Sequence, residues 1–496
     1  MSSEPIERRV SYVGDKLRCS YCPACGKSYF GTRRYCGYCG RDTLGKMKRI
    51  DLFFEKGVLE SFTVITEPTN RFKPLNPYVY GLISFDNGKI CLPGRLTDYF
   101  FDGGLENIEG REVLPRIRRR YSVGKSDIIP TISLTFTFAD EYYPHQEYRV
   151  TKPSKEYEKP GIVGFASYTS RFRIREGSVE RSIPFIDEDA ITAAVEACKL
   201  ALIHSGVNHS LIGKVYAGSE SNPYAVKPIA SKVAQVLDLG VGGEDVRGVD
   251  AIDTQFACKA ATSVFKDAVA LTYYPDSGVE YAMVVGTDNS QAAPRGKLGG
   301  ELDFFVGYGA AAFIFGRYDV VAEVEAWYSC TSDTADFWRR DTELYPRHGG
   351  RFTGEPAYFK HVEHAARKLM DKLRLQPNDV QYFVPHQPNA SFPVKVARKL
   401  GFKEEQYAPG LQVSKFGNLY SGSSPLGLVA VLEQAKPYER ILLVSYGSGA
   451  GSDAYTFITT PQITEKRQKF TVKWQASNPF LKYVDYNTYR RFKRGL

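Results

Sequence analysis

The sequence lacks an apolar run long enough to cross a bilayer, which takes about 20 consecutive residues in a helix. Its first residues, Met1-Ser2-Ser3-Glu4-Pro5, begin no apolar segment of the secretory type. We therefore expect a protein with no membrane partner and a cytoplasmic location.

The sequence also lacks a large charge excess, since its net charge is +9 over 496 residues. This charge suits phosphorylated cofactors as well as nucleic acid. An arginine run at Arg116, Arg118, Arg119 and Arg120 would support nucleic-acid binding. The aromatic and basic residues nearby form no RNP-like pattern, however, and a short arginine run is more often a solvated or interface face. We expect no nucleic-acid partner.

Cysteine is unevenly placed, with five of nine residues between Cys19 and Cys39. In a cytosolic chain such a cluster indicates a metal site rather than disulfides. Two matching knuckles, Cys22-x-x-Cys25-Gly and Cys36-x-x-Cys39-Gly, have glycine where a tight turn needs a permissive backbone. Four thiolates suit closed, structural Zn²⁺. We predict a zinc ribbon over 1–45, with Cys19 as a rival ligand, and no redox cofactor.

Short strands are predicted after the ribbon, at 59–66, 78–85 and 89–92, and Asp86-Asn87-Gly88 is a hairpin turn signal between the last two. Their spacing favours a small five-stranded OB-type barrel over 46–125. We interpret 126–160 as an extension and linker, with one strand-like piece at 132–138.

From Gly161 onward, apolar strands alternate with helical segments, which predicts a layered α/β fold. The chain is too long for one ordinary core, so two or three domains are expected. A helix from Ala190 to about His204, capped by Asp187-Glu188-Asp189, is apolar nearly all round and should be buried. Polar residues follow several of the predicted strands, where sites open in such sheets.

Cys258 is the first candidate, because small residues surround it and a helix is expected from Ala260 to Leu271. A thiol at a helix N-terminus is shifted toward thiolate by the helix dipole and can present a bound carbonyl to backbone N–H groups. The alternative is a small buried apolar residue, as most free cysteines are.

Four further candidates stand at predicted strand ends or in a loop. Glu220 is either a general base with a pKa raised by burial or a charge at a helix start. His386, flanked by prolines, is a catalyst or a satisfied polar residue. Asn418 binds substrate or fills a turn. The loop 447–452 lacks the Lys-Ser/Thr ending of a P-loop and is interpreted as an oxyanion-binding backbone.

The order Glu220, Cys258, His386, Asn418, glycine loop resembles the thiolase superfamily, whose condensing enzymes use Cys-His-Asn. The upstream glutamate is similar to that of 3-hydroxy-3-methylglutaryl-CoA (HMG-CoA) synthases, above all the archaeal type. The matching stretches are 218–227, 256–260, 348–361, 386–389, 417–424 and 442–453. The ribbon and barrel, over about 15–100, resemble the OB-fold, rubredoxin-ribbon proteins that accompany thiolase-superfamily enzymes and are thought to hold acyl-CoA.

The resemblance implies a thiolase-like layered αβαβα fold over 161–496, with duplicated halves at about 161–320 and 321–461, a tail over 462–496, and a homo-oligomer. It implies that Cys258 takes acetyl from acetyl-CoA and that Glu220 removes a methyl proton. The carbanion then attacks the ketone of acetoacetyl-CoA while His386 polarises and protonates its oxygen, and water releases HMG-CoA for isoprenoid synthesis by the mevalonate route. An acetoacetyl-CoA thiolase is the expected partner.

By the same resemblance, Asn418 and Ser448 hold thioester or substrate carboxyl oxygens and Thr353 touches the substrate. Arg351 and Lys395 would bind CoA. Two departures concern these surfaces: Phe305 stands where a threonine is expected, and Ser391 stands where a CoA-facing lysine is expected. The segment between 171–174 and the cap at 187–189 is also shorter than in relatives.

Two other functions fit parts of the pattern. A β-ketoacyl synthase-type enzyme would use Cys-His-Asn with another acyl acceptor and without the glutamate. A non-catalytic scaffold would use the ribbon and barrel to dock a thiolase. The basic tail at 489–494 is interpreted as a solvated end or a contact for an acidic partner, the former being favoured.

Overall fold

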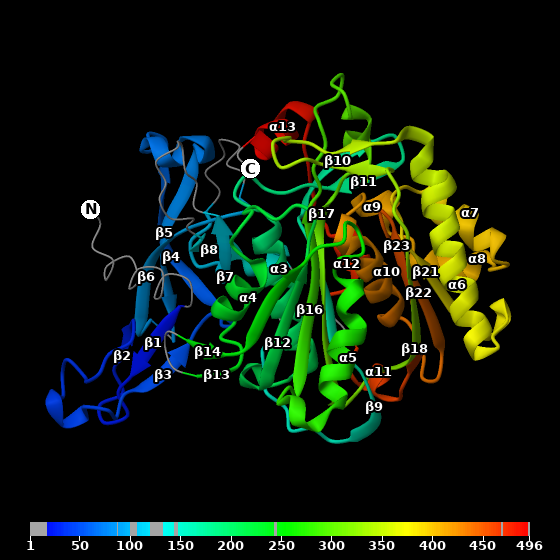
Figure 1. Ribbon diagram of the computed structural model, residues 1–496. Coiled ribbons are helices and arrows are strands. Elements are labelled where there is room, and N and C mark those ends of the chain that lie inside the picture. Colours follow the sequence, from blue (N-terminus) through cyan, green and yellow to red (C-terminus); the bar gives the residue numbers. More distant parts are fainter. Residues whose placement is uncertain are drawn as a thin grey trace. The chain divides into compact units, whose positions relative to one another are not determined.

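The computed structural model describes residues 17–86, 88–99, 107–119, 132–142, 147–242, 246–467 and 470–494. The chain forms two compact units (Figure 1). Unit 1 comprises Met1–Glu147, Phe185–Glu188 and Arg491–Gly495, and unit 2 comprises essentially all the rest. Within the described ranges, no helix is long and apolar enough to cross a membrane.

Unit 1 begins with a three-stranded antiparallel sheet in the order β2-β1-β3, which carries the cysteine knuckles. Its strands are β1 (Arg18–Tyr21), β2 (Ser28–Phe30) and β3 (Lys48–Asp51). A curled five-stranded antiparallel sheet follows, in the order β6-β5-β4-β7-β8. Its strands are β4 (Gly57–Ile65), β5 (Tyr78–Phe85), β6 (Ile90–Arg95), β7 (Glu112–Arg119) and β8 (Ile132–Phe138).

The curl of the second sheet comes from its two outer strands. Leu96, just after β6, forms a bridge with Phe136 of β8, so the sheet bends toward closure as a half-barrel. Phe136 is fully buried and packs with Ile83 and Leu92 in the core of this unit. β8 lies in the stretch predicted to be an extension and linker, yet it pairs with β7 along its length. Asn87 of the predicted hairpin turn lies outside the described residues.

The arginine run corrects one prediction. Arg116 and Arg118 are fully buried rather than solvated, and Arg120 lies outside the described residues. Arg118 Nη2 is 2.8 Å from Asp98 Oδ2 and 3.1 Å from Glu188 Oε1. Burying these charges requires such carboxylate partners. These two arginines therefore form neither a nucleic-acid face nor a solvated face.

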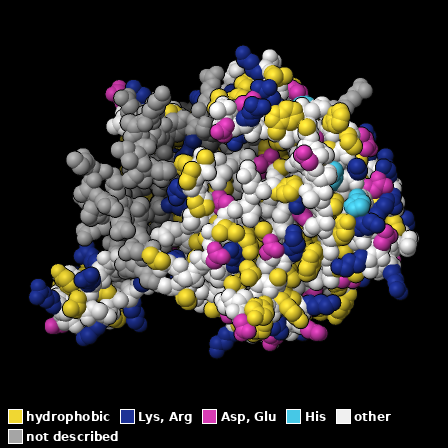
Figure 2. Space-filling view, in the orientation of Figure 1, with side chains coloured by type: hydrophobic (Ala, Val, Ile, Leu, Met, Phe, Trp, Pro, Cys, Tyr) yellow, Lys and Arg dark blue, Asp and Glu magenta, His cyan; other side chains and the backbone are white. Residues whose placement is uncertain are grey.

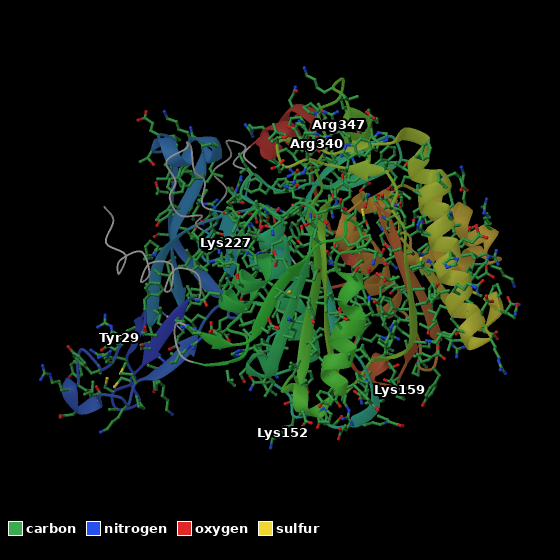
Figure 3. All side chains as sticks on the ribbon, viewed as in Figure 1. Tyr29, Lys152, Lys159, Lys227, Arg340 and Arg347 are labelled. Carbon is green, nitrogen blue, oxygen red and sulfur yellow. The ribbon has the colours of Figure 1, made fainter. Side chains whose placement is uncertain are left out.

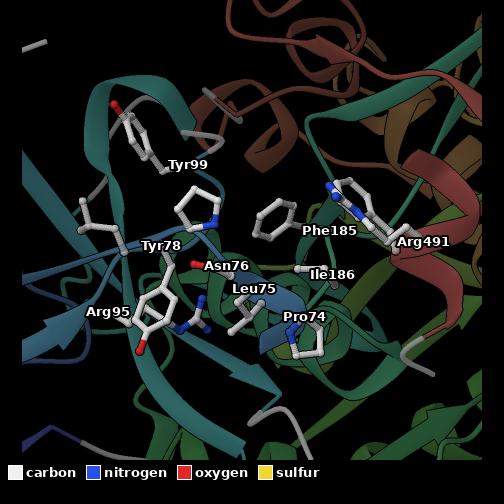
Figure 4. A pocket seen from close by; sticks show the side chains of 12 residues that line it. Pro74, Leu75, Asn76, Tyr78, Arg95, Tyr99, Phe185, Ile186 and Arg491 are labelled. Carbon is white, nitrogen blue, oxygen red and sulfur yellow. The ribbon is translucent and has the colours of Figure 1, made fainter. Parts of the chain in front are cut away.

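Asp187 also differs from its prediction, because it pairs with a buried arginine. It was expected in the cap of the following helix, but it forms a buried ion pair with Arg95. Segment 185–188 and the chain end at 491–495 thus belong to unit 1. Together with the turn around Asn76 they line a cavity of about 100 Å³, whose walls include Tyr78, Phe185 and Arg491 (Figure 4).

Unit 2 is built on a nine-stranded sheet in the order β15-β12-β16-β17-β9-β18-β23-β22-β21. The strands are β9 (Glu156–Thr169), β12 (Ile212–Gly218), β15 (Asp250–Thr254), β16 (Tyr281–Asn289), β17 (Tyr308–Tyr318), β18 (Ala322–Thr331), β21 (Tyr382–Pro385), β22 (Arg440–Gly447) and β23 (Gly451–Thr459).

The pairing pattern of this sheet occurs twice. From the centre outward, β9-β17-β16-β12 pair as antiparallel, antiparallel and parallel. The series β18-β23-β22-β21 pairs in the same way. β9 and β18 join the two series through a short antiparallel contact. β12 and β21 occupy equivalent places in the two series, because each lies parallel to its inner neighbour.

Helices cover both faces of these strands. α3 (Ala190–Ser205) is buried along nearly its whole length, as predicted, and begins with an Asp189–Thr192 capping box. α10 (Ser423–Leu432) is entirely buried and packs against strands of both series. α5 (Phe265–Tyr273) begins later than predicted, after a 3-10 turn at Thr262–Val264. Figure 1 shows α6 (Phe359–Leu373), in yellow, beside β18 and β22.

The remaining elements are short. The helices are α2 (Ala139–Tyr142), α4 (Ile229–Val236), α7 (Ser391–Lys399), α8 (Glu404–Tyr407), α9 (Val413–Phe416), α11 (Gln462–Glu465), α12 (Val472–Ser477) and α13 (Tyr486–Arg494). The strands are β10 (Phe172–Glu176), β11 (Val179–Ser182), β13 (Val241–Gly242), β14 (Arg247–Gly248), β19 (Phe337–Trp338), β20 (Arg347–His348) and β24 (Lys482–Tyr483).

Candidate active site

Cys258 lies in a tight turn between β15 and the 3-10 turn that precedes α5. Ala257, just before it, has φ 42°, a left-handed conformation that costs energy for any residue with a Cβ. The turn also packs tightly on Gly218, the last residue of β12. A Cβ on Gly218 would lie 2.2 Å from the backbone nitrogen of Ala261. The turn that carries Cys258 is therefore held directly against the strand that leads to Glu220.

Glu220 and Cys258 are in direct contact, since the Cys258 thiol donates to Glu220 Oε1 over 2.8 Å. Burial, with a further contribution from the Asp288 charge, raises the pKa of Glu220 to about 8. Burial and the neighbouring Glu220 raise the pKa of the Cys258 thiol well above its usual value. The predicted thiolate is therefore wrong for the resting site, which holds a neutral thiol beside its base.

Asp288 lies near the end of β16 and was not named as a candidate from the sequence. It is fully buried, and its Oδ1 accepts hydrogen bonds from the backbone N–H of Glu220 and from both the N–H and the hydroxyl of Ser221. Its Oδ2 accepts from the N–H of Ser421. Asp288 thus fixes the Glu220 loop. The available signal was a carboxylate at the end of β16, beside β12.

His386 follows β21 directly and is 1% exposed. Its Nδ1 lies 3.2 Å from Ser424 Oγ, and its backbone oxygen accepts a 2.5 Å hydrogen bond from the Tyr358 hydroxyl. Burial lowers the pKa of His386 to about 3, so the imidazole is neutral at physiological pH. If the Ser424 hydroxyl donates to Nδ1, then Nε2 carries the proton and is a hydrogen-bond donor.

One cavity of about 190 Å³ brings most of the predicted residues together. Its lining includes Cys258, Thr353, His386, Asn418 and Ser448. Glu220 is not among the lining residues and reaches the cavity through its contact with the Cys258 thiol.

The Asn418 amide has a defined orientation in this cavity. Its Oδ1 accepts from the Tyr420 N–H and from the Ser423 hydroxyl. The amide NH₂ is therefore the group that Asn418 can offer to a carbonyl oxygen.

The glycine loop at 447–452 forms the connection between β22 and β23. Asp336 holds it, because its carboxylate accepts from the Tyr446 hydroxyl over 2.5 Å and from the Gly449 N–H over 2.8 Å. A buried ion pair lies behind it, with Lys259 Nζ 2.8 Å from Asp453 Oδ2. These contacts place the loop beside the turn that carries Cys258, as an oxyanion-binding role requires.

Of the two residues predicted to bind CoA, Lys395 is not at this cavity. Its side chain is exposed on α7. The backbone of Arg351 lies in the 3-10 helix Gly350–Thr353, while its side chain lies outside the described atoms. Ser391 is exposed at the start of α7. Phe305 does line the cavity. Its ring is larger than the threonine side chain expected at this position, so it leaves less space.

Several cavity residues were not predicted from the sequence. Glu301 and His348 form a pair, with 2.5 Å between Oε1 and Nε2, and both line the cavity. The aromatic rings of Tyr358, Tyr420 and Tyr446 line it as well. His348 and the three tyrosines lie within the matching stretches 348–361, 417–424 and 442–453, yet none of them was named as a site residue. Only the fold brings them to the cavity.

The four cysteines predicted as metal ligands come together in the ribbon of unit 1. The sulfur atoms of Cys22, Cys25, Cys36 and Cys39 all lie within 4.8 Å of one another. Gly26 and Gly40, after each knuckle, have φ 73° as the argument required. Cys19 is not part of the cluster; its thiol contacts the Leu17 carbonyl oxygen, and burial raises its pKa to about 12.

The surroundings of this cluster also fit a metal–thiolate centre. The Tyr29 hydroxyl lies 3.1 Å from Cys36 Sγ (Figure 3), and the Cys39 N–H donates to the same sulfur. Between Arg18 and Ile50 the sequence has eight basic residues and one acidic residue. Lysine and arginine side chains accordingly gather on the ribbon in Figure 2. This excess would counteract the negative charge of four thiolates if they held a divalent ion.

Solved structures share the fold of unit 2. One described as "MvaS in complex with 3-hydroxy-3-methylglutaryl coenzyme A" superposes with a TM-score of 0.59 at 20% identity, over 69% of this chain and 92% of that chain. Another, "PksG, a HMG-CoA Synthase from Bacillus subtilis", gives 0.58 at 20% identity, over 68% and 88%. A model of the 3-oxoacyl-[acyl-carrier-protein] synthase III C terminal matches residues 370–457. These likenesses define a thiolase-like α/β fold for unit 2.

Sequence relatives narrow this class. The hydroxymethylglutaryl-CoA synthase of Methanopyrus kandleri is 44% identical over 68% of this chain and 98% of its own length. The synthase of Archaeoglobus fulgidus is 46% identical over 68% of this chain and 99% of its own length. The chain therefore belongs to the hydroxymethylglutaryl-CoA synthase family, and carries an additional N-terminal region with a four-cysteine cluster.

Proposed function

We propose that the chain condenses acetyl-CoA with acetoacetyl-CoA to give HMG-CoA and CoA, through an acetyl group carried on Cys258. The observation that carries this proposal is the 2.8 Å contact between the Cys258 thiol and Glu220, at a cavity that also holds His386 and Asn418. A neutral thiol needs a base beside it before it can attack a thioester. Glu220 meets that need.

In the first step, Glu220 accepts the thiol proton while Cys258 Sγ bonds to the acetyl carbon. The carbon–sulfur bond of acetyl-CoA breaks, and CoA leaves with the proton that Glu220 accepted, which returns Glu220 to its carboxylate form. The Asn418 amide and the backbone of the glycine loop are the donors available for thioester oxygens. Once Cys258 is acylated, it no longer donates to Glu220, so the carboxylate is released for the next step.

In the second step, Glu220 removes a proton from the acetyl methyl group, and the carbanion attacks the ketone carbon of acetoacetyl-CoA. His386 polarises the ketone oxygen as a neutral hydrogen-bond donor, because its low pKa leaves it without a second proton to give. The proton that Glu220 removed is available for the new hydroxyl group. Water then cleaves the thioester to Cys258 and frees HMG-CoA.

Thr353 and Ser448 are proposed to contact the substrate, as cavity-lining residues with hydroxyl groups. Arg351 and Lys395 are proposed to bind CoA outside the cavity. The four cysteines are proposed to hold one structural Zn²⁺, and the half-barrel to be an OB-type module for acyl-CoA. We also propose that the fold consists of two duplicated halves of αβαβα type and that the chain forms a homo-oligomer. An acetoacetyl-CoA thiolase partner and a cytoplasmic location are proposed as well.

A β-ketoacyl synthase-type reaction is the second candidate, because the synthase III C-terminal model matches residues 370–457. Glu220→Ala separates the two. Under our proposal the variant loses carbon–carbon bond formation, measured as acceptor-dependent CoA release. If bond formation persists at the wild-type rate, Glu220 is not the base and the second candidate replaces the first.

A further inference from the structure

The wall of the active-site cavity includes one short segment of unit 2. This segment comprises the 3-10 helix Gly300–Phe304 and the two residues after it, and we refer to it as the wall segment. Glu301, Leu302, Phe305 and Val306 from this segment line the cavity together with Cys258. Leu302 and Phe305 are apolar and bulky, so their positions decide how much space an acyl group finds beside the nucleophile.

The wall segment is anchored through Asp303, whose carboxylate is fully buried. Its Oδ1 accepts a 2.8 Å hydrogen bond from the Tyr489 hydroxyl. Arg490 Nη1 lies 3.6 Å from the same oxygen, and Arg295 Nε lies 3.3 Å from Oδ2. A buried carboxylate is tolerated only with partners of this kind. Two of the three partners belong to α13, at the end of the chain.

Arg181 and Arg295 add further anchors between α13 and the wall segment. The Arg181 guanidinium lies 5.4 Å from the ring centre of Tyr489 and donates to the Val306 carbonyl oxygen over 3.1 Å. Arg295 lies between the rings of Phe304 and Tyr486, at 4.0 and 4.3 Å from their centres. The start of α13 therefore holds the wall segment through hydrogen bonds, charges and rings.

This arrangement corrects the prediction that the tail at 489–494 is a solvated end or a contact for an acidic partner. Tyr489 is 1% exposed, and its hydroxyl is directed to Asp303. Arg490 has an intramolecular carboxylate partner. Figure 1 shows α13, in red, near β10, the strand that pairs with the β24 segment preceding it.

We propose that Tyr489, through Asp303, is a positioning residue that sets the acyl-acceptor specificity of the enzyme. The bond holds Leu302 and Phe305 against the cavity, so that the site accepts a four-carbon β-ketoacyl group and excludes longer ones. This inference rests on the proposed condensation. Neither residue touches the reacting atoms, and their effect is exerted through the wall segment.

The test compares Tyr489→Phe with wild type in the full-length protein. The substitution removes one hydroxyl and keeps the ring under Arg181, so it is unlike a truncation that would unfold the tail. Tyr483→Phe is the matched control, since its hydroxyl contacts Arg175 and Glu180 on the same C-terminal segment but not the wall segment. Two quantities are measured: the rate of Cys258 acetylation by acetyl-CoA, and kcat/KM for acetoacetyl-CoA and for 3-oxohexanoyl-CoA.

We expect Tyr489→Phe to raise the kcat/KM ratio of the six-carbon to the four-carbon acceptor at least ~5-fold, within the range that pocket fit supplies. Cys258 acetylation should stay within about twofold of wild type, as should both quantities in Tyr483→Phe. An unchanged ratio overturns the inference. So does a parallel loss of acetylation and of both condensations, which would indicate a merely structural role. If wild type itself is not acetylated, the proposed function fails and this inference fails with it.

Discussion

At the scale of single residues, the site depends on how Glu220, Cys258 and Asp288 share charge in a small buried volume. Burial favours the neutral forms of both carboxylates, and at Glu220 the nearby Asp288 charge adds to this effect. The pKa of Glu220 is therefore raised to about 8 and that of Asp288 to about 6. A base whose pKa lies near the working pH is suited to removing a weakly acidic proton.

The raised pKa of Glu220 predicts the pH dependence of the condensation. Only the carboxylate form accepts a proton, so kcat/KM should rise with pH and level off above about 8. In Glu220→Gln this limb should disappear, and the rate of carbon–carbon bond formation should fall about 10²- to 10⁴-fold. A pH–rate profile of purified wild type and variant measures both effects.

Asp288→Asn provides the complementary variant. Asp288 is the second cause of the raised Glu220 pKa, after burial. Removing its charge should therefore move the limb of the profile to lower pH, in addition to any loss of rate from a misplaced Glu220 loop. A limb that stays at the wild-type pH would show that Asp288 does not set the pKa of Glu220.

The placement of Glu220, Cys258 and His386 near one another was predictable from the sequence, because each follows a strand. The protonation state of Cys258 was not predictable. The expected thiolate assumed a helix beginning at Ala260, whereas α5 begins at Phe265 and the nearest charge is Glu220. Protonation states depend on neighbours in three dimensions, such as Asp288 and Asp336, and no local sequence pattern predicts these neighbours.

At the scale of elements, alternation and caps gave reliable predictions. The buried helix after Asp189 and the strand at 132–138 both appear where expected. The partners of these elements were harder to predict from the sequence, because pairing joins segments that lie far apart in the chain. The strand at 132–138, expected within a barrel extension and linker, pairs with β7 in the half-barrel, and Asp187 pairs with Arg95 rather than capping α3.

The close approach between β12 and the turn that carries Cys258 gives a prediction at this scale. A Cβ on Gly218 would lie 2.2 Å from the Ala261 nitrogen, so backbone must move. We expect Gly218→Ala to lower the free energy of unfolding by about 1–3 kcal/mol, as overpacking does. It should also slow acetylation of Cys258, because the turn that carries the thiol is displaced.

Gly213→Ala is the control for that variant, since it adds the same methyl group to the same strand. Its nearest contact would be 3.2 Å, to the Val279 Cα, so a small shift relieves it. Denaturant unfolding and acetylation by labelled acetyl-CoA distinguish the two. Equal behaviour of both variants in acetylation would contradict a specific role for the Gly218 contact.

At the scale of the whole molecule, the chain combines a family fold with an added cysteine-rich region. The alternation of strands and helices was expected to begin at Gly161, and unit 2 begins at Tyr148. The return of 185–188 and 491–495 to unit 1 was not predictable, because it depends on contacts between segments far apart in sequence, such as Asp187 with Arg95.

The metal proposal belongs to this scale, because the ribbon adds only a few apolar residues, such as Leu17 and Cys19, to the core of unit 1. We expect about one zinc ion per chain by elemental analysis, and its loss in Cys39→Ser together with local unfolding of the ribbon. Cys91→Ser, an exposed cysteine outside the cluster, should keep the metal. Full zinc retention in Cys39→Ser would rule out the proposed ligand set.

The central claim is that Cys258 carries the acetyl group, and mass spectrometry of the protein after brief incubation with acetyl-CoA tests it most directly. The account predicts one acetyl group, on the peptide containing Cys258, absent in Cys258→Ser and discharged when acetoacetyl-CoA is added. An unmodified Cys258 peptide, with or without the second substrate, would contradict it.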